Sequence, residues 1–182
     1  MRPSGDRVKL YALVIYLAEP LAGFLDDLRL EMAPDCNPRA HVSVLPPRPL
    51  ENDAGAAIQE VSRVVSEFPA FEIELGKIDV FPVTDVIYIT IESGDEQLRQ
   101  LHAAANRGAL AFDEPFPYHP HVTLAQDLEP GHTDRLRELA IRRWREFDGP
   151  RSFRVESAVF VQNAQGNQWI DLAEGRLRGA PA

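Results

Sequence analysis

Two short segments of this sequence resemble each other and lie in different halves of the chain. Residues 41–45 read HVSVL and residues 121–125 read HVTLA, so each begins with a histidine and carries a hydroxyl residue two positions later. Both are apolar runs of strand length, and Pro46 and Pro47 stop the first of them. The recurrence predicts a chain built from two similar halves, each containing one such strand.

The faces of these two strands differ in polarity. Side chains of a strand alternate, so His41 should share a face with Ser43, and His121 should share a face with Thr123. An imidazole on an otherwise apolar strand costs free energy unless it has a partner. Because the placement occurs twice, we expect a functional rather than a structural role, with both pairs facing one cleft.

Two imidazoles and two hydroxyls around one phosphorus atom would have complementary roles. A neutral imidazole can accept a proton from water while a protonated one donates to the leaving oxygen, and both work near the ordinary histidine pKa of about 6.5. The hydroxyls of Ser43 and Thr123 can donate to the non-bridging oxygens, where negative charge builds. This chemistry needs no metal and no cofactor, and we expect neither.

The rest of the sequence alternates strand-like and helix-like segments, which favours α+β lobes over a doubly wound parallel sheet. Besides the motif segments, we expect strands at 8–17, 71–80, 86–91, 153–161 and 168–172 and helices at about 20–32, 52–68, 95–110 and 135–144. Asn52 or Asp53 can cap the second helix. Residues 7–174 should form a single bilobal domain, with flexible termini at 1–6 and 175–182.

Charge and composition limit the partners. A net charge of −9 disfavours long duplex nucleic acid, which usually requires a basic face, but a few local donors can still bind one small anion. The apolar segment 10–18 is too short to span a bilayer, so we expect no membrane partner. Cys36 is the single cysteine, which rules out an internal disulfide and suits the cytoplasm. We expect a monomer.

HVSV at 41–44 and HVTL at 121–124 resemble the paired His-x-Ser/Thr-hydrophobic motifs of the 2H phosphoesterase superfamily. Their context, AHVSVLPPRPL and YHPHVTLAQ, is similar to its bacterial 2′–5′ RNA ligase or cyclic phosphodiesterase-like branch, and the resemblance covers most of residues 7–172. It implies a bilobal pseudo-two-fold fold in which two antiparallel sheets flank a central cleft, with helices outside. It also implies catalysis by His41 and His121 and phosphate binding by Ser43 and Thr123.

Other residues near the motifs are weaker candidates. Several relatives carry an arginine soon after the second motif, where this chain has Gln126, and Arg48 could supply a cation instead or be a solvated loop residue. Tyr118 and His119 are further possible substrate contacts. His119 with His41 could also suggest a metal site, but no carboxylate or cysteine falls at ligand spacing. His102 and His132 are expected to be exposed.

The resemblance and the residues together predict a metal-independent phosphoesterase that hydrolyses a 2′,3′-cyclic or 2′-linked phosphodiester of an RNA 3′ end or a small nucleotide. His121 is the expected base and His41 the expected acid, although the near-symmetry of the motifs leaves the roles exchangeable. Two alternatives stay open. One is a non-catalytic module that binds nucleotides or RNA ends, and the other is a phosphodiesterase with a non-nucleotide substrate.

Overall fold

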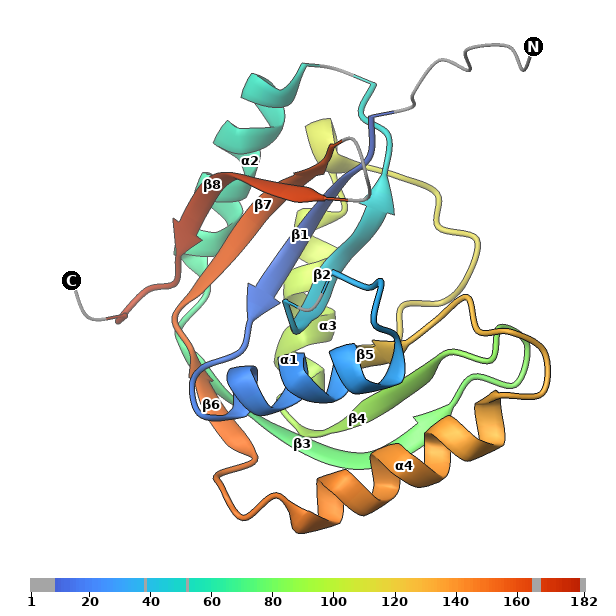
Figure 1. The fold of residues 1–182 in the computed structure, drawn as a ribbon. Helices are drawn as coiled ribbons and strands as arrows, with labels where there is room; N and C mark the ends of the chain where they lie inside the picture. Colours follow the sequence, from blue (N-terminus) through green and yellow to red (C-terminus); the bar gives the residue numbers. More distant parts are fainter. Residues whose placement is uncertain (1–8, 38, 52, 165–167, 181–182) are drawn as a thin grey trace, which may run out of the picture.

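The computed structural model describes residues 9–37, 39–51, 53–164 and 168–180. Strands and helices alternate along the chain, as the sequence predicts (Figure 1). Their bounds, in chain order, are β1 Tyr11–Tyr16, α1 Leu21–Met32, β2 His41–Arg48, α2 Ala54–Glu67, β3 Phe71–Val80, β4 Ile87–Ser93, α3 Asp95–Ala105, the short 3-10 helix Gly108–Leu110, β5 His121–Ala125, α4 Thr133–Glu146, β6 Ser152–Val155, β7 Ser157–Asn163 and β8 Trp169–Arg176.

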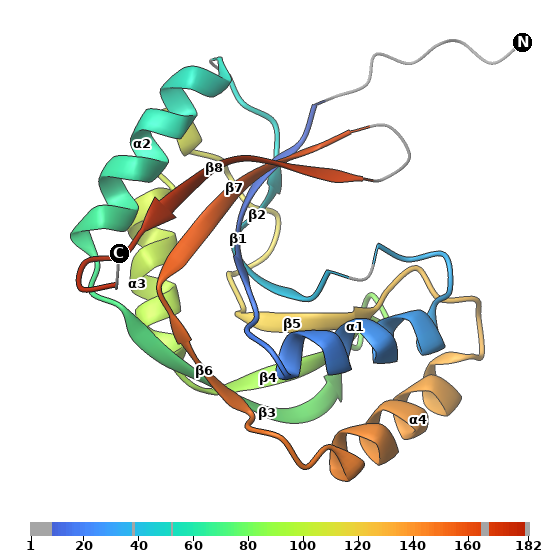
Figure 2. The same cartoon turned by 60° about the vertical axis from the view of Figure 1, so that its left-hand side comes forward.

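The described strands form one curled antiparallel sheet with the order β6-β3-β4-β5-β2-β1-β7-β8 (Figures 1 and 2). The two motif strands, β2 and β5, are neighbours at its centre and pair through Val42 and Val122. The α+β class is therefore confirmed. The two sheets expected from the sequence prove to be the two halves of one sheet, because this pairing joins them.

The two halves of the sheet, β6-β3-β4-β5 and β2-β1-β7-β8, exchange one helix each. Helix α1 follows β1 in sequence but contacts β5, and α3 follows β4 but contacts β2. The other two helices stay in the half of the preceding strand, where α2 contacts β8 and α4 contacts β3. Figure 2 shows the result, with α2 and α3 beside one half of the sheet and α1 and α4 beside the other. The larger of two hydrophobic clusters draws buried residues from both halves.

Local sequence explains where the helices begin and end. Asp53 caps α2 because its carboxylate accepts the backbone N–H groups of Gly55 and Ala56, at 2.7 and 3.2 Å. Helix α3 was expected to continue to residue 110 but ends at Ala105, and a 3-10 turn follows. Gly108 opens that turn with φ of +54°, a left-handed conformation that glycine adopts at no steric cost.

The C-terminal segment corrects one prediction. A flexible tail was expected from residue 175, but β8 runs to Arg176 and Leu177 is buried in the core. Beyond the strand, Arg178 donates its N–H to the carbonyl of Phe68 at 2.8 Å and accepts from Ala70 at 3.0 Å. Strand pairing and the burial of Leu177 thus hold this segment in place, although its glycines and proline are typical of a flexible tail. Residues 1–6 and 181–182 lie outside the described residues. No helix in the described part of the chain has the length and apolarity needed to cross a membrane.

Candidate active site

The four motif side chains lie on the face of the sheet opposite the core. Val42 and Val122 are fully buried and oppose each other across the central strand pair. In an antiparallel register this places His41 opposite Thr123 and His121 opposite Ser43. The two histidines are then diagonal neighbours, which are spaced by roughly 7–8 Å in such a pair. That spacing leaves room for one phosphate group between the imidazoles.

Both imidazoles are held by the same local hydrogen bond. Nδ1 of His41 lies 2.8 Å from the carbonyl oxygen of Arg39, and Nδ1 of His121 lies 2.6 Å from that of His119. A carbonyl can only accept, so Nδ1 carries the hydrogen in both rings. Each neutral ring therefore keeps Nε2 as its available proton acceptor.

Burial lowers the pKa of both histidines. For His41 the bond to the Arg39 carbonyl opposes this shift, while the positive charges of Arg29, His121 and Arg39 add to it. For His121 burial is again the main cause, the carbonyl of His119 opposes it, and the charge of His119 adds to it. Without a ligand, both rings are thus biased towards the neutral form. One ring is ready to act as a base, and the other needs an anionic ligand to favour its protonated form.

The surroundings of His41 are charged. The Tyr16 ring lies edge-on to the imidazole at 6.4 Å between ring centres, and the Arg39 guanidinium covers that tyrosine ring at 3.4 Å. Asp171 on β8 accepts hydrogen bonds from the Tyr16 hydroxyl at 2.8 Å and from Arg39 at 2.9 Å. A hollow of about 410 Å³ is lined by these three residues and by parts of β7 and β8.

The surroundings of His121 are aromatic. Phe81 and Tyr88 stack at 4.0 Å between ring centres, and His121 meets them edge-on at 5.0 and 5.3 Å. The exposed His119 lies against the same pair, at 5.2 Å from Phe81. The structure thus brings His119 beside the second motif, as a substrate contact there would require.

Arg48 is not placed where the sequence suggested. Its side chain is only 1% exposed, and it pairs with the carboxylate of Glu114 in the interior. The guanidinium also donates to Asn106 Oδ1 at 2.6 Å and to the Leu110 carbonyl at 3.1 Å. An arginine held in this way cannot reach a ligand without leaving these partners, so we correct its expected role from substrate contact to buried ion pair.

Tyr118 is hydrogen-bonded to the first motif strand. Its hydroxyl donates to the Ser43 carbonyl at 2.8 Å, and its ring stacks on His102 at 4.0 Å between ring centres. Burial raises the pKa of Tyr118, which keeps the hydroxyl protonated as a donor. His102 was expected to be exposed but is mostly buried and bonds to Glu114 at 2.9 Å. His132 is exposed, as expected.

One cation near the motifs was missed in the sequence. Arg29 on α1 is 9% exposed, and it donates to the Thr123 carbonyl at 2.5 Å and to the Asn37 carbonyl at 2.9 Å. Its Nε has no hydrogen-bond partner among the described residues. Arg29 thus ties the second motif strand to the loop before the first. The available signal was its position on the buried stripe of α1, four residues after Leu25.

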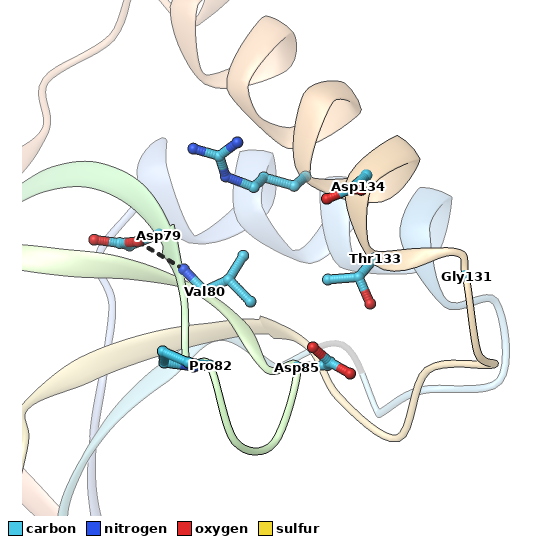
Figure 3. A pocket seen from close by; sticks show the side chains of 8 residues that line it. Asp79, Val80, Pro82, Asp85, Gly131, Thr133 and Asp134 are labelled. Carbon is cyan, nitrogen blue, oxygen red and sulfur yellow. Dashed lines mark hydrogen bonds between the residues drawn. The ribbon is translucent and has the colours of Figure 1, made fainter.

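A second pocket, of about 500 Å³, lies between the β3–β4 connection and the first turn of α4 (Figure 3). Asp79, Asp85 and Asp134 are among its lining residues, but no motif residue is. Across the described ranges, no group of three or more histidine, cysteine or acidic side chains is placed to hold a metal ion. This pocket therefore gives no support to a metal site.

Paired His-x-hydroxyl strands at the centre of one antiparallel sheet define the class of two-histidine phosphoesterases. Residues 18–167 match the family described as the 2′-5′ RNA ligase superfamily. The chain belongs to this family.

Named relatives point to the same class. The chain is 27% identical over 130 residues to the “Putative phosphoesterase” of Geobacillus thermodenitrificans. This match covers 66% of this chain and 70% of that protein. It is 34% identical over 80 residues to a likewise named protein of Oceanobacillus iheyensis, covering 43% of this chain and 46% of the relative. This second match thus spans less than half of that relative's length.

Solved structures share the fold. Escherichia coli LigT complexed with 3′-AMP superposes with a TM-score of 0.66 at 16% identity, covering 94% of this chain and 99% of LigT. The protein TT0787 of Thermus thermophilus gives a TM-score of 0.66 at 18% identity, covering 93% of this chain and 98% of that protein. At these identities the likeness concerns the fold alone.

Proposed function

We propose that this protein is a metal-independent phosphoesterase that hydrolyses a 2′,3′-cyclic or 2′-linked phosphodiester of a small nucleotide or an RNA 3′ end. The observation that carries the proposal is the matched pair of imidazoles. His41 and His121 each bond through Nδ1 to the carbonyl two residues earlier, so that Nε2 is the free nitrogen of both rings. They share one face of the sheet with the hydroxyls of Ser43 and Thr123.

The proposed reaction is addition of water across one P–O bond. Nε2 of His121 accepts a proton from water as the water oxygen bonds to phosphorus, and the protonated His41 donates its proton to the leaving oxygen as that bond breaks. The product is a phosphomonoester, and the two rings return to their starting states by proton exchange with solvent. Ser43 and Thr123 donate to the non-bridging oxygens, whose negative charge grows in the transition state.

The lowered pKa values fit this scheme when the substrate is an anion. A phosphodiester carries one negative charge, which favours a protonated imidazole beside it and opposes the effect of burial on His41. Arg29 places a further positive charge behind the second motif strand, where Gln126 supplies none. The net charge of −9 speaks against long nucleic acid as the substrate.

Small nucleotides are the ligands we propose, because a protein of this fold has been crystallised with them. LigT has been crystallised with 3′-AMP, with phosphate, with ATP and with NADP+. A monomer working in the cytoplasm is the arrangement we propose, since the single Cys36 requires no oxidising compartment.

The test offers 2′,3′-cyclic nucleotides and 2′–5′ dinucleotides to the wild type and to His41→Ala and His121→Ala, with a chelator present. General acid and base catalysis each contribute typically 10²–10⁴-fold, so either substitution should lower kcat by at least about 100-fold. His132→Ala, at an exposed histidine outside the motifs, is the matched control and should retain activity.

Two results would reject this function. Activity that survives both motif substitutions would remove the histidines from the mechanism, and activity abolished by the chelator would make a metal necessary. Tight binding of a nucleoside monophosphate without turnover of any diester would instead favour a binding module. Turnover of non-nucleotide diesters alone would favour the remaining alternative.

A further inference from the structure

The two halves of the site repeat the histidine geometry but differ in the space beside it. Next to His121 lie the stacked rings of the half-buried Phe81 and the buried Tyr88. Next to His41 lies the hollow of about 410 Å³ that begins at Tyr16 and Arg39. Identical catalytic groups with unequal room on their two sides can bind a substrate in one direction only.

We propose that this hollow is the subsite for the nucleoside that carries the leaving oxygen, and that this nucleoside has an amino-bearing base and no further phosphate. The inference rests on the proposed function and deepens it. It also fixes the direction of the reaction, with His41 as the acid and His121 as the base.

Hydrolysis at phosphorus is expected to proceed by in-line displacement. Water enters on one side of phosphorus and the leaving oxygen departs on the opposite side, so the base faces a water molecule and the acid faces an organic group. The hollow that begins at Tyr16 adjoins His41, whereas the rings of Phe81 and Tyr88 lie against His121. We therefore place the nucleoside with its leaving oxygen on this side, where His41 donates the proton to that oxygen.

Strand register shows that the hollow is continuous with the site. Tyr16 on β1 pairs with His41 on β2, so their side chains are neighbours on the same face of the sheet. From Tyr16 the hollow extends over β7 and β8, where Ser157 and Ala173 are among its lining residues. Figure 2 shows β1, β7 and β8 running side by side in this half of the molecule. A ligand can thus reach from the imidazole into the hollow without crossing a strand.

The charges in the hollow define the kind of occupant. Asp171 and Glu174 supply two carboxylates and Arg39 one guanidinium, so the lining carries an excess of negative charge. Asp171 already accepts from Tyr16 and Arg39, which holds the wall in place, while Glu174 is an exposed acceptor. Carboxylates accept hydrogen bonds from amino groups and repel phosphates. Adenosine, cytidine and guanosine fit these charges, and a 5′-phosphorylated nucleoside does not.

The experiment compares two cyclic phosphates with the same reacting ring. One is adenosine 2′,3′-cyclic phosphate and the other is glycerol 1,2-cyclic phosphate, which has no nucleoside. Ser157→Trp fills the hollow with a large side chain. Ser152→Trp, on the exposed surface of β6, is the matched control for the same substitution on the sheet. The quantity measured is the ratio of kcat/KM for the adenosine ester to kcat/KM for the glycerol ester.

We expect Ser157→Trp to lower this ratio at least tenfold, mainly through KM for the adenosine ester, and Ser152→Trp to leave the ratio as in the wild type. An unchanged ratio in Ser157→Trp, with both esters still hydrolysed, would overturn the subsite and leave the proposed function standing. Wild-type protein that hydrolyses neither ester would overturn both. Val159→Trp fills the same hollow from β7 and replaces Ser157→Trp if that variant does not fold.

A second comparison tests the chemistry of the occupant. The wild type should prefer the cyclic esters of adenosine and cytidine over that of uridine, which has no amino group. Glu174→Gln keeps the size of the side chain but removes its charge, so this preference should shrink, and an added 5′-phosphate should be tolerated better. A wild type that prefers uridine or a 5′-phosphorylated ester would contradict the proposed occupant.

Discussion

Replacing Glu114 with glutamine should destabilise the protein strongly, although Glu114 lies in an irregular segment and in neither motif. The carboxylate pairs with Arg48, whose side chain is 1% exposed, and it is the one acidic partner of this guanidinium among the described residues. Glu114→Gln leaves the positive charge buried with only neutral partners, such as Asn106 Oδ1 and the Leu110 carbonyl. Breaking a buried pair from one side costs about 3–5 kcal/mol.

For a chain of this length, 1 kcal/mol corresponds to about 2–4 °C in Tm, so Glu114→Gln should lower Tm by roughly 6–20 °C. Urea denaturation followed by circular dichroism measures the same loss as a lower midpoint with an unchanged slope. Glu67→Gln is the control, because Glu67 pairs with Arg63 at the surface, where ion pairs contribute little.

The double variant Arg48→Met with Glu114→Leu separates the charge from the packing. It buries no ion, so it should regain much of the stability that Glu114→Gln loses. A Glu114→Gln protein as stable as the wild type would refute the reasoning, and so would a double variant that is less stable than the single one. The double variant should also keep the KM of the wild type, because Arg48 is enclosed in the interior.

Three further predictions concern the site. The pKa of both His41 and His121 is lowered, so each loses its proton at a lower pH than an ordinary histidine. The acid must keep its proton for the reaction, so kcat/KM against pH should be a bell that is highest below about pH 6.5 and falls on the alkaline side; a profile that still rises above pH 8 would contradict this. Arg29→Met removes a positive charge that lowers the pKa of His41, so histidine NMR titration should show that pKa rising. Arg143→Met, which breaks surface pairs with Glu31 and Glu146, should not move it. Tyr118→Phe removes the hydrogen bond to the first motif strand, so urea denaturation should show a loss of about 0.5–1.5 kcal/mol, and stability equal to the wild type would argue against this support.

The pairing of the motif strands could be predicted from the sequence because it depends on local rules. Side-chain alternation sets His41 and Ser43 on one face, and the repeat of the pattern at His121 and Thr123 indicates a second equivalent strand. The capping of α2 by Asp53 is local in the same way, since it involves residues within three positions. Rules of this range need no knowledge of the tertiary fold.

The environments of Arg48 and Arg29 could not be predicted because their partners are distant in the chain. Arg48 lies beside a Pro-rich stretch typical of an exposed loop, and its carboxylate partner, Glu114, comes 66 residues later. Arg29 reaches the carbonyl of Thr123, which is 94 residues away, from a helix that packs on the opposite half of the sheet. The exchange of helices between the halves creates this contact, and no local pattern reports that exchange.

The same backbone feature that makes the two histidines alike also makes their surroundings differ. Each imidazole is held by the carbonyl of the residue two positions earlier, which is Arg39 in one strand and His119 in the other. In an extended chain the side chain of that residue projects to the same face as the histidine. The carbonyl therefore fixes the tautomer whatever the residue is, while its side chain is free to vary. Arg39 lines the charged hollow, and His119 packs edge-on against Phe81. A symmetric catalytic pair can in this way bind an asymmetric substrate in one direction.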